Sequence, residues 1–231
     1  MRDRYPASKP AYFVRHGESE ANVGRPVFDE ENIRLTDRGR AQANAVANVL
    51  HPLGPRNIVL SPYLRTRLTA EPLLALNPTI VPNIWPVQEF NYIAYPPGIA
   101  ITPEYRRQRS IEYWTRADPD YIAGPNTESF RQFIGRVWNT LQRIQQLPDT
   151  TMVFTHGTFM KALIWLSANG LRPEDITSQN MKEFLVFDSK FDIPNTAVIK
   201  VENGKIKMLK NYPQSEETSQ TRATDTILSE I

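Results

Sequence analysis

The sequence contains no cysteine, which excludes disulfide bonds, thiolate catalysis and cysteine-ligated metal sites. It also contains no apolar run of the roughly 18 residues that a membrane span requires. The first residues, MRDRYPASKPAYFVRHG, lack the apolar stretch of a signal peptide. These absences favour a cytoplasmic protein that does not enter a membrane.

The sequence also has no large excess of positive or negative charge. The chain has 27 Lys and Arg against 25 Asp and Glu, a formal net charge of +2, and no basic block dominates any segment. Nucleic acid is therefore not indicated as a partner, whereas a small anionic substrate fits this balance. No exposed apolar stripe can be separated from the core positions, so the sequence does not set an oligomeric state.

Histidine is scarce, and its placement is informative. Of the three histidines, two follow short apolar runs and precede glycine, in Val14-Arg15-His16-Gly17 and Phe154-Thr155-His156-Gly157. Both runs are typical of buried strands, and ligands of open α/β sheets bind beyond the carboxyl ends of the strands. We therefore expect both imidazoles to face one crevice, where the helix after His156 directs its N–H groups at an anion. His51, beside Pro52, is interpreted as a solvated residue or a helix-end contact.

A third apolar run, NIVLSP over residues 57–62, ends just before Arg65. Arg15 and Arg65 supply forked, permanently charged donors that match phosphate oxygens. A single Arg-His-Gly tripeptide occurs by chance, and a histidine at a strand end can be a core residue. Two strand-His-Gly units together with a strand-Ser-Pro-x-x-Arg unit instead indicate a phosphate pocket built without a glycine-rich loop.

The remaining patterns set the fold class. Helices are expected after Thr36, through Arg65, Thr69 and Leu73, and over residues 104–116, 128–146 and 159–166. A hairpin is expected over 197–201 and 205–209. Strands alternating with helices predict a three-layer α/β/α sandwich with a largely parallel central sheet. The proline-rich residues 77–125 are interpreted as a cap-like insertion over the substrate. We expect one domain over residues 1–212 and a disordered tail over 213–231.

Four segments resemble the motifs of the histidine phosphatase superfamily, in its phosphoglycerate-mutase-like branch with the RHG motif. They are FVRHGESEAN (13–22), LTDRGRAQA (35–43), SPYLRTRLTA (61–70) and FTHG (154–157). The resemblance covers about residues 11–201 and implies that His16 is a nucleophile that forms a phosphohistidine. It implies that Arg15, Arg65 and His156 hold the phosphate oxygens. Asn22, Ser19 and the Gly157 N–H are expected as further donors, and no metal or other cofactor is implied.

The family also uses an acid, and Glu89 matches its usual position after the third strand. The alternative for Glu89 is a solvated loop residue. Glu18 is a rival within the first motif but resembles a structural position of the family, and Glu128 is expected in the first turn of a helix. Asn195 resembles a loop support near the site.

The same core serves phosphatases and mutases. Glu89-Phe90-Asn91-Tyr92 departs from the acid-Arg-His-Tyr-Gly segment of phosphoglycerate mutases, which favours a phosphomonoester phosphatase acting on a small phosphorylated metabolite. A mutase stays open because an arginine pair among Arg106, Arg107 and Arg109 can hold a substrate carboxylate; the alternative for these arginines is a solvated helix face. Tyr92 either lines the pocket or packs the loop. A catalytically silent phospho-ligand-binding protein is a third hypothesis, against which the intact nucleophile and acid argue.

Overall fold

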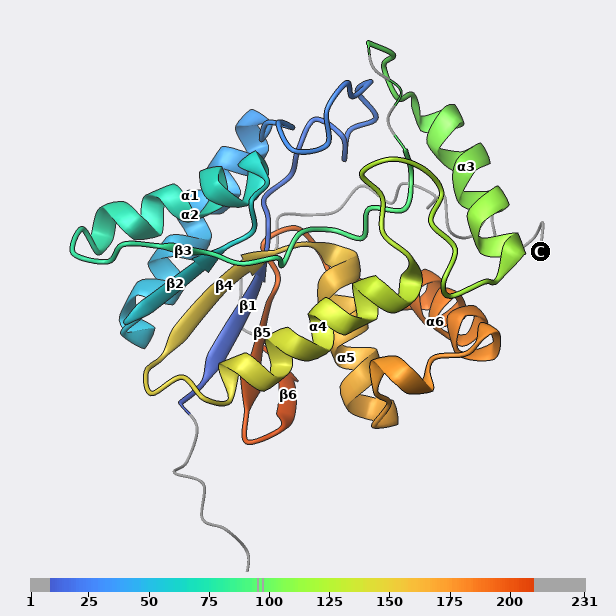
Figure 1. Cartoon of the computed structure of the whole chain (residues 1–231). Helices are drawn as coiled ribbons and strands as arrows, with labels where there is room; N and C mark the ends of the chain where they lie inside the picture. The colour runs from blue at the N-terminus through green and yellow to red at the C-terminus, as the bar shows by residue number, and fades with distance from the viewer. Residues whose placement is uncertain (1–8, 95, 97, 210–231) are drawn as a thin grey trace, which may run out of the picture.

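A computed structural model describes residues 9–94, 96 and 98–209 of the chain, so the tail over 213–231, predicted to be disordered, lies outside the described residues. The described chain forms a six-stranded sheet with the strand order β3-β2-β4-β1-β5-β6 (Figure 1). The strands are β1 (Ala11–Arg15), β2 (Asn57–Leu60), β3 (Asn83–Ile84), β4 (Thr151–Thr155), β5 (Val198–Glu202) and β6 (Lys205–Met208).

The sheet is mixed and mostly parallel, which confirms the predicted fold class. Strands β1 and β2 each pair in parallel with β4, and β3 pairs in parallel with β2. Strands β5 and β6 form an antiparallel hairpin on the other side of β1. Because Arg15 is level with Thr155 and Leu60 is level with Phe154, the carboxyl ends of β1, β2 and β4 meet at one edge.

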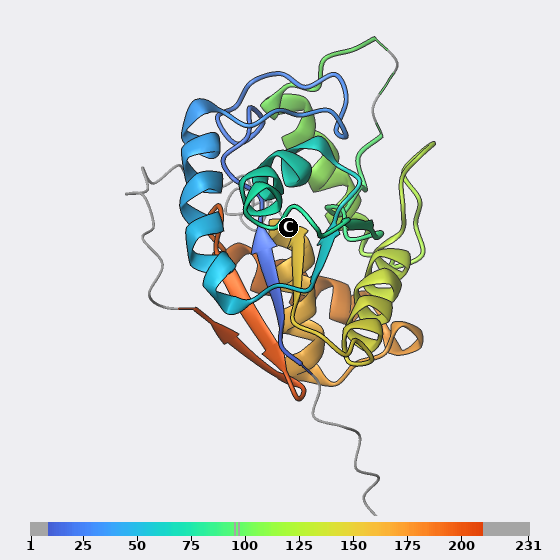
Figure 2. The same ribbon diagram turned by 90° about the vertical axis from the view of Figure 1, so that its left-hand side faces the viewer.

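Helices cover both faces of this sheet (Figure 2). They are α1 (Asp37–Leu50), α2 (Leu64–Leu76), α3 (Pro103–Arg116), α4 (Phe130–Ile144), α5 (Gly157–Asn169) and α6 (Ser178–Lys190), with short 3₁₀ helices at His51–Leu53 and Pro173–Asp175. Alternate residues of β1 serve the two layers, since Val14 packs with α1 and α2 whereas Phe13 packs with α4 and α5. The result is a three-layer sandwich.

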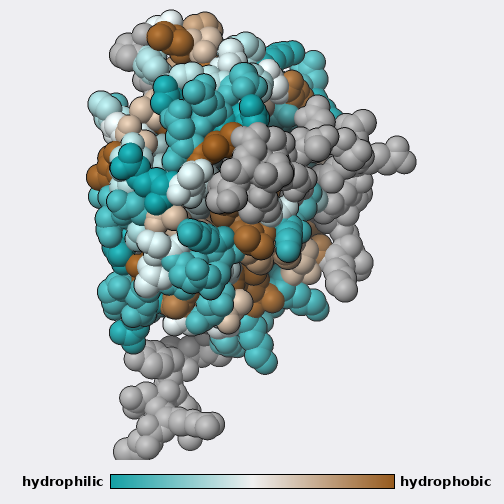
Figure 3. Space-filling view, turned by 90° about the vertical axis from the view of Figure 1, so that its right-hand side faces the viewer, coloured by the Kyte–Doolittle hydropathy of each residue, from teal (hydrophilic) through white to brown (hydrophobic). Residues whose placement is uncertain are grey.

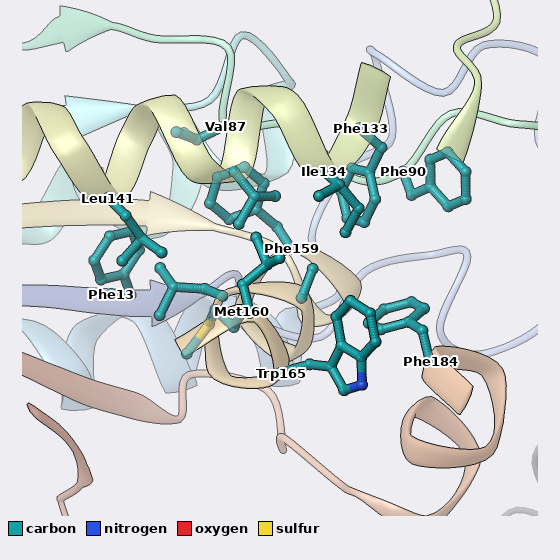
Figure 4. Packing of buried hydrophobic residues seen from close by; sticks show 14 of the residues in the cluster. Phe13, Val87, Phe90, Phe133, Ile134, Leu141, Phe159, Met160, Trp165 and Phe184 are labelled. Carbon is teal, nitrogen blue, oxygen red and sulfur yellow. The ribbon is translucent and has the colours of Figure 1, made fainter. Parts of the chain in front are cut away.

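The larger core lies between the sheet and α4, α5 and α6, and it is rich in aromatic rings (Figure 4). Phe133, Phe159 and Phe184, one from each of these helices, are fully buried. Phe90, in the loop after β3, stacks on Phe133 with 4.4 Å between ring centroids. The residue that follows Glu89 is thus anchored in the core.

Helix α6 and the start of α4 differ from the sequence-based expectations. No helix is predicted over Ser178–Lys190, where Thr177 nevertheless forms a capping box with Asn180. Helix α4 begins at Phe130, later than predicted, because Ser129 caps it and forms a capping box with Gln132. Glu128 therefore precedes the helix instead of lying in its first turn.

Residues 77–125 contain β3, irregular chain and α3, close to the expected boundaries. An isolated antiparallel bridge between Val27 and Ile101 joins this segment to the loop after β1. Tyr113 and Trp114 of α3 pack against Phe90 at 5.8 and 6.1 Å between ring centroids. None of the helices in the described part of the chain combines the length and the apolar character that crossing a membrane would take.

Candidate active site

Two histidine rings lie side by side at the carboxyl edge of the sheet. His16 follows β1, and His156 follows the adjacent strand β4 and caps α5. Their ring centroids are 5.1 Å apart, and the two residues are only 4 % and 0 % exposed. The structure therefore brings together the two imidazoles that the sequence predicts to share one crevice.

The orientation of His16 fixes its tautomer. Its Nδ1 atom lies 2.7 Å from the carbonyl oxygen of Gly17. Because a carbonyl only accepts, Nδ1 carries the hydrogen and Nε2 keeps a free lone pair. Burial, followed by the charges of Arg65 and Arg15, lowers the pKa of His16 well below its usual value. A neutral ring with a free Nε2 lone pair is the form that a nucleophile requires.

His156 is oriented by a serine hydroxyl. Its Nε2 atom lies 2.8 Å from Oγ of Ser61, which accepts the Tyr63 N–H at 3.2 Å and can therefore donate its own hydrogen to Nε2. In the neutral ring Nδ1 then carries a hydrogen, and it is a buried donor without a partner among the described residues. Burial, then Arg65 and His16, lowers the pKa of His156. A neutral His156 thus has an N–H available for an anion.

Arg15 and Arg65 flank the histidine pair. Arg15 donates from Nη1 to the carbonyl oxygen of Ile193, and its guanidinium lies against Gly157, where a Cβ atom would be 3.4 Å from Nε. The side chain of Arg65 is 4 % exposed and lies over the ring of Tyr63 at 4.8 Å. The buried guanidinium group of Arg65 and the partly buried one of Arg15, beside two neutral imidazoles, create a local positive potential suited to a phosphate.

A carboxylate that the sequence analysis missed occupies part of this cationic region. Oε1 of Glu30 lies 3.1 Å from Nη2 of Arg65, whose Nη1 donates to the main-chain oxygen of Glu30 at 2.7 Å. Oε2 of Glu30 lies 3.4 Å from Nη2 of Arg106 on α3. The run Asp29-Glu30-Glu31 has the composition of a solvated loop, so no local signal distinguishes Glu30.

Three of the four arginines of α3, Arg106, Arg107 and Arg109, therefore differ in their surroundings. Arg107 pairs with Glu104 at 3.2 Å, and Arg109 pairs with Glu112 at 2.7 Å, both within the helix. The face of the molecule that carries α3 and α6 is largely hydrophilic (Figure 3). Arg106 instead contacts Glu30, which also binds Arg65, the expected phosphate ligand.

The carboxylate of Glu89, from the loop after β3, lies at the start of α5, the helix that follows His156. Its carboxylate oxygens accept hydrogen bonds from the main-chain N–H groups of Thr158 at 3.3 Å and Phe159 at 3.2 Å. A carboxylate is stabilised at a helix N-terminus by these N–H groups and the helix dipole. The carboxyl group of the expected acid thus lies at the N-terminus of the helix that follows His156.

Arg136 of α4 holds the loop that carries Glu89, and the sequence analysis missed it too. It donates to the main-chain oxygens of Gln88 at 2.6 Å and Glu89 at 2.9 Å. Glu128 binds the same guanidinium at 2.6 and 2.8 Å. The sequence offers one signal for Arg136, which is its position directly before Val137 of the apolar stripe that predicts this helix.

Asn22 and Ser19 stabilise the loop after His16. Oδ1 of Asn22 accepts hydrogen bonds from the N–H and the hydroxyl of Ser19, both at 3.0 Å. The side chain of Asn195 donates to the main-chain oxygen of His16 at 3.0 Å and to Asn22 at 3.3 Å. Asn195 therefore supports this loop, as expected.

Contacts of Glu18 and Gly39 join the segment over residues 35–43 to the segment over residues 13–22, which carries His16. The carboxylate of Glu18 accepts from Thr36 at 2.7 Å and from Arg38 at 3.2 Å, which agrees with a structural position. A Cβ atom at Gly39 would lie 2.0 Å from the Glu18 carbonyl oxygen, so only glycine permits this approach. The start of α1 thus packs directly against the nucleophile loop.

Tyr92 connects the Glu89 loop to α3. Its hydroxyl lies 2.8 Å from Oγ of Ser110, and its ring lies 4.7 Å from that of Tyr113. Burial raises the pKa of Tyr92, so its hydroxyl stays protonated. These contacts are those of a residue that packs the loop. Within residues 9–94, 96 and 98–209, no group of three or more His, Asp and Glu side chains is placed to share a metal ion.

Comparison with known proteins places the chain in a family. The model of the histidine phosphatase superfamily (branch 1) matches residues 11–185. The chain belongs to this superfamily, as the four motifs predict.

Relatives of both reaction types are similar to the chain. The 2,3-bisphosphoglycerate-dependent phosphoglycerate mutase of Bartonella henselae is 28 % identical over 178 residues, which cover 73 % of this chain and 85 % of the mutase. The solved structure of a putative α-ribazole-5'-P phosphatase from Escherichia coli has a TM-score of 0.63 at 19 % identity, covering 87 % of this chain and 95 % of that one. Phosphoserine phosphatase from Entamoeba histolytica, solved with 3-phosphoglyceric acid, has a TM-score of 0.60 at 18 % identity, covering 87 % and 98 %. At these identities the solved structures share the fold.

Proposed function

We propose that the chain is a phosphomonoester phosphatase that acts on a small phosphorylated metabolite through a phosphohistidine at His16, without a metal ion. The observation that carries the proposal is the hydrogen bond from His16 Nδ1 to the Gly17 carbonyl oxygen, in a ring whose centroid lies 5.1 Å from that of His156. It leaves Nε2 as a nucleophile in a pocket lined by guanidinium groups.

In the first step, the Nε2 lone pair of His16 attacks phosphorus and the bond from phosphorus to the ester oxygen breaks. Arg15, Arg65 and the Nδ1–H of His156 bind the phosphoryl oxygens and stabilise the charge of the transition state, and the Gly157 N–H adds a donor. Glu89 transfers a proton to the leaving oxygen, which departs as an alcohol.

In the second step, the Glu89 carboxylate takes a proton from a water molecule, whose oxygen attacks the phosphohistidine. The N–P bond breaks, inorganic phosphate leaves, and both His16 and Glu89 return to their starting forms. The N–H groups of Thr158 and Phe159, in the first turn of α5, stabilise the carboxylate form of Glu89, which is the form that acts as the base in this step.

A mutase is the second candidate, favoured by the similarity to the Bartonella enzyme. A mutase would return the phosphoryl group from His16 to another hydroxyl of a bound intermediate. The Glu89-Phe90-Asn91-Tyr92 segment, in which Phe90 stacks on Phe133 and Tyr92 binds Ser110, supports the phosphatase instead. The pairing of Arg106 with Glu30 also supports the phosphatase, because Arg106 already binds a carboxylate of the protein in place of a substrate carboxylate.

Two assays test the proposal. Hydrolysis of p-nitrophenyl phosphate in EDTA is expected, and its absence would leave the silent phospho-ligand-binding protein as the better hypothesis. Incubation with 3-phosphoglycerate and 2,3-bisphosphoglycerate should release inorganic phosphate or leave the substrate unchanged. Accumulation of 2-phosphoglycerate would instead establish the mutase. A screen of phosphorylated metabolites then identifies the substrate.

A further inference from the structure

Glu30 connects the candidate phosphate pocket with α3. Its carboxylate bridges Arg65 at 3.1 Å and Arg106 at 3.4 Å, and the side chain is 15 % exposed. The flanking chain is fixed at two points. The Leu64 N–H donates to the Glu31 carbonyl oxygen at 2.7 Å, and Val27 and Ile101 exchange hydrogen bonds of 3.0 and 2.6 Å.

We propose that Glu30 is a specificity residue that selects phosphomonoesters whose leaving group carries no second anionic group close to the phosphoryl group. This inference rests on the proposed phosphatase function, and it narrows the substrate class. Small phosphorylated alcohols and sugars belong to the accepted class. Phosphorylated hydroxy acids belong to the disfavoured class.

The charges around the pocket give the reason. Without Glu30, the guanidinium groups of Arg65 and Arg106 would create a cationic region able to hold a phosphoryl group and an adjacent carboxylate together. Glu30 neutralises one of these charges and places its own negative charge between them. The phosphoryl group keeps Arg15, Arg65 and His156, whereas a second anion near Arg106 meets the Glu30 carboxylate.

A matched pair of substrates isolates this effect. Glycerol 3-phosphate and 3-phosphoglycerate differ in that a hydroxymethyl group replaces a carboxylate. We expect the wild-type protein to hydrolyse glycerol 3-phosphate with the higher kcat/KM. In Glu30→Gln the kcat/KM for glycerol 3-phosphate divided by that for 3-phosphoglycerate should fall about three- to tenfold. This is the size expected for removing one charge within several Å of the substrate carboxylate.

Glu31→Gln is the matched control, since it removes a neighbouring, exposed carboxylate of the same loop. It should leave the ratio of the two kcat/KM values within about twofold of the wild type, because an exposed charge is screened by solvent. An equal change in both variants would indicate a general charge effect of the loop and would overturn the role of Glu30.

The wild-type protein offers a test that does not depend on the folding of a variant. Raising the salt concentration screens repulsion, so the preference for glycerol 3-phosphate should shrink from 0.05 to 0.5 M NaCl, roughly the range over which the screening length falls severalfold. A preference that grows with salt would mean that the pocket attracts the carboxylate, which would overturn the inference.

Failure of the function and failure of the inference give different results. If p-nitrophenyl phosphate is not hydrolysed, the phosphatase function fails and this inference fails with it. If p-nitrophenyl phosphate is hydrolysed but Glu30→Gln keeps the wild-type ratio, or the wild type prefers 3-phosphoglycerate, the phosphatase stands and Glu30 loses its proposed role.

Discussion

The guanidinium of Arg136 donates a hydrogen bond of 2.9 Å to the main-chain oxygen of Glu89, although 47 positions separate the two residues. The same group binds the Gln88 carbonyl oxygen and both carboxylate oxygens of Glu128. An arginine on a rigid helix thus fixes the backbone of an irregular loop, and with it the carboxylate that we propose as the acid.

Arg136→Gln is expected to slow the reaction by loosening this loop. Breaking the largely buried pair with Glu128 should lower the free energy of unfolding by about 3 kcal/mol. The readout specific to positioning is the leaving group. The loss in kcat should be larger for an alkyl phosphate than for p-nitrophenyl phosphate, because only the alkyl phosphate needs a well-placed proton donor.

The control for this variant is Arg67→Gln, which removes an exposed arginine of α2. It should change neither the free energy of unfolding beyond about 0.5 kcal/mol nor the dependence on the leaving group. If Arg136→Gln reduced kcat equally for both substrates, its role would be structural only.

Glu89→Gln tests the acid itself. Gln keeps the shape of the side chain but cannot transfer a proton, so turnover of an alkyl phosphate should fall by about 10²–10⁴-fold. The loss should be much smaller for p-nitrophenyl phosphate, whose leaving group departs without protonation. Steady-state kinetics with both substrates check this, and Glu71→Gln, on the exposed side of α2, is the control. An equal loss for both substrates would argue against Glu89 as the leaving-group acid.

The sequence predicts the features that repeat a local pattern. Strand β1 ends at Arg15-His16-Gly17 and β4 ends at Thr155-His156-Gly157, and parallel pairing makes those ends meet. The buried positions of helix α6, Met181, Phe184, Leu185 and Ser189, have helical spacing. The prediction missed this helix because Ser189 is polar, and because the apolar residues Val186 and Phe187 lie outside the buried stripe and blur the pattern.

Local sequence patterns could not identify residues that contact the site from distant positions in the sequence. Glu30 reaches Arg65 from 35 positions away, and Arg136 reaches Gln88 from 48 positions away. Each lies in a segment whose local composition is that of solvated surface or an ordinary helix. Their contacts exist only because the tertiary fold places two loops beside the carboxyl edge of the sheet, and no local pattern encodes that placement.

The lowered pKa values of His16 and His156 predict how stability depends on pH. Both shifts arise first from burial and next from the charge of Arg65. As the pH falls from about 7 to 5, the unfolded chain binds protons at these imidazoles while the folded chain does not. The free energy of unfolding should therefore fall by up to about 1.4 kcal/mol per pH unit for each ring.

Urea unfolding at pH 7 and at pH 5.5 measures this dependence. His16→Ala should reduce the pH slope of the free energy of unfolding, because one of the two depressed groups is removed. His51→Ala, at an exposed position, should keep the wild-type slope. A slope that is the same in all three proteins would show that the buried rings do not set the pH dependence.

His16→Ala also tests the nucleophile directly. The variant loses the Nε2 lone pair but keeps Arg15, Arg65 and His156, so turnover should be abolished while inorganic phosphate still binds, more weakly than in the wild type. Phosphate release and isothermal titration calorimetry measure the two effects separately, with His51→Ala as the control for both. In the wild type, acid-labile and alkali-stable phosphate attached to the protein should accumulate when the reaction is quenched during turnover. Retained turnover in His16→Ala would remove His16 from the nucleophile role, because the variant has no imidazole at that position to attack phosphorus.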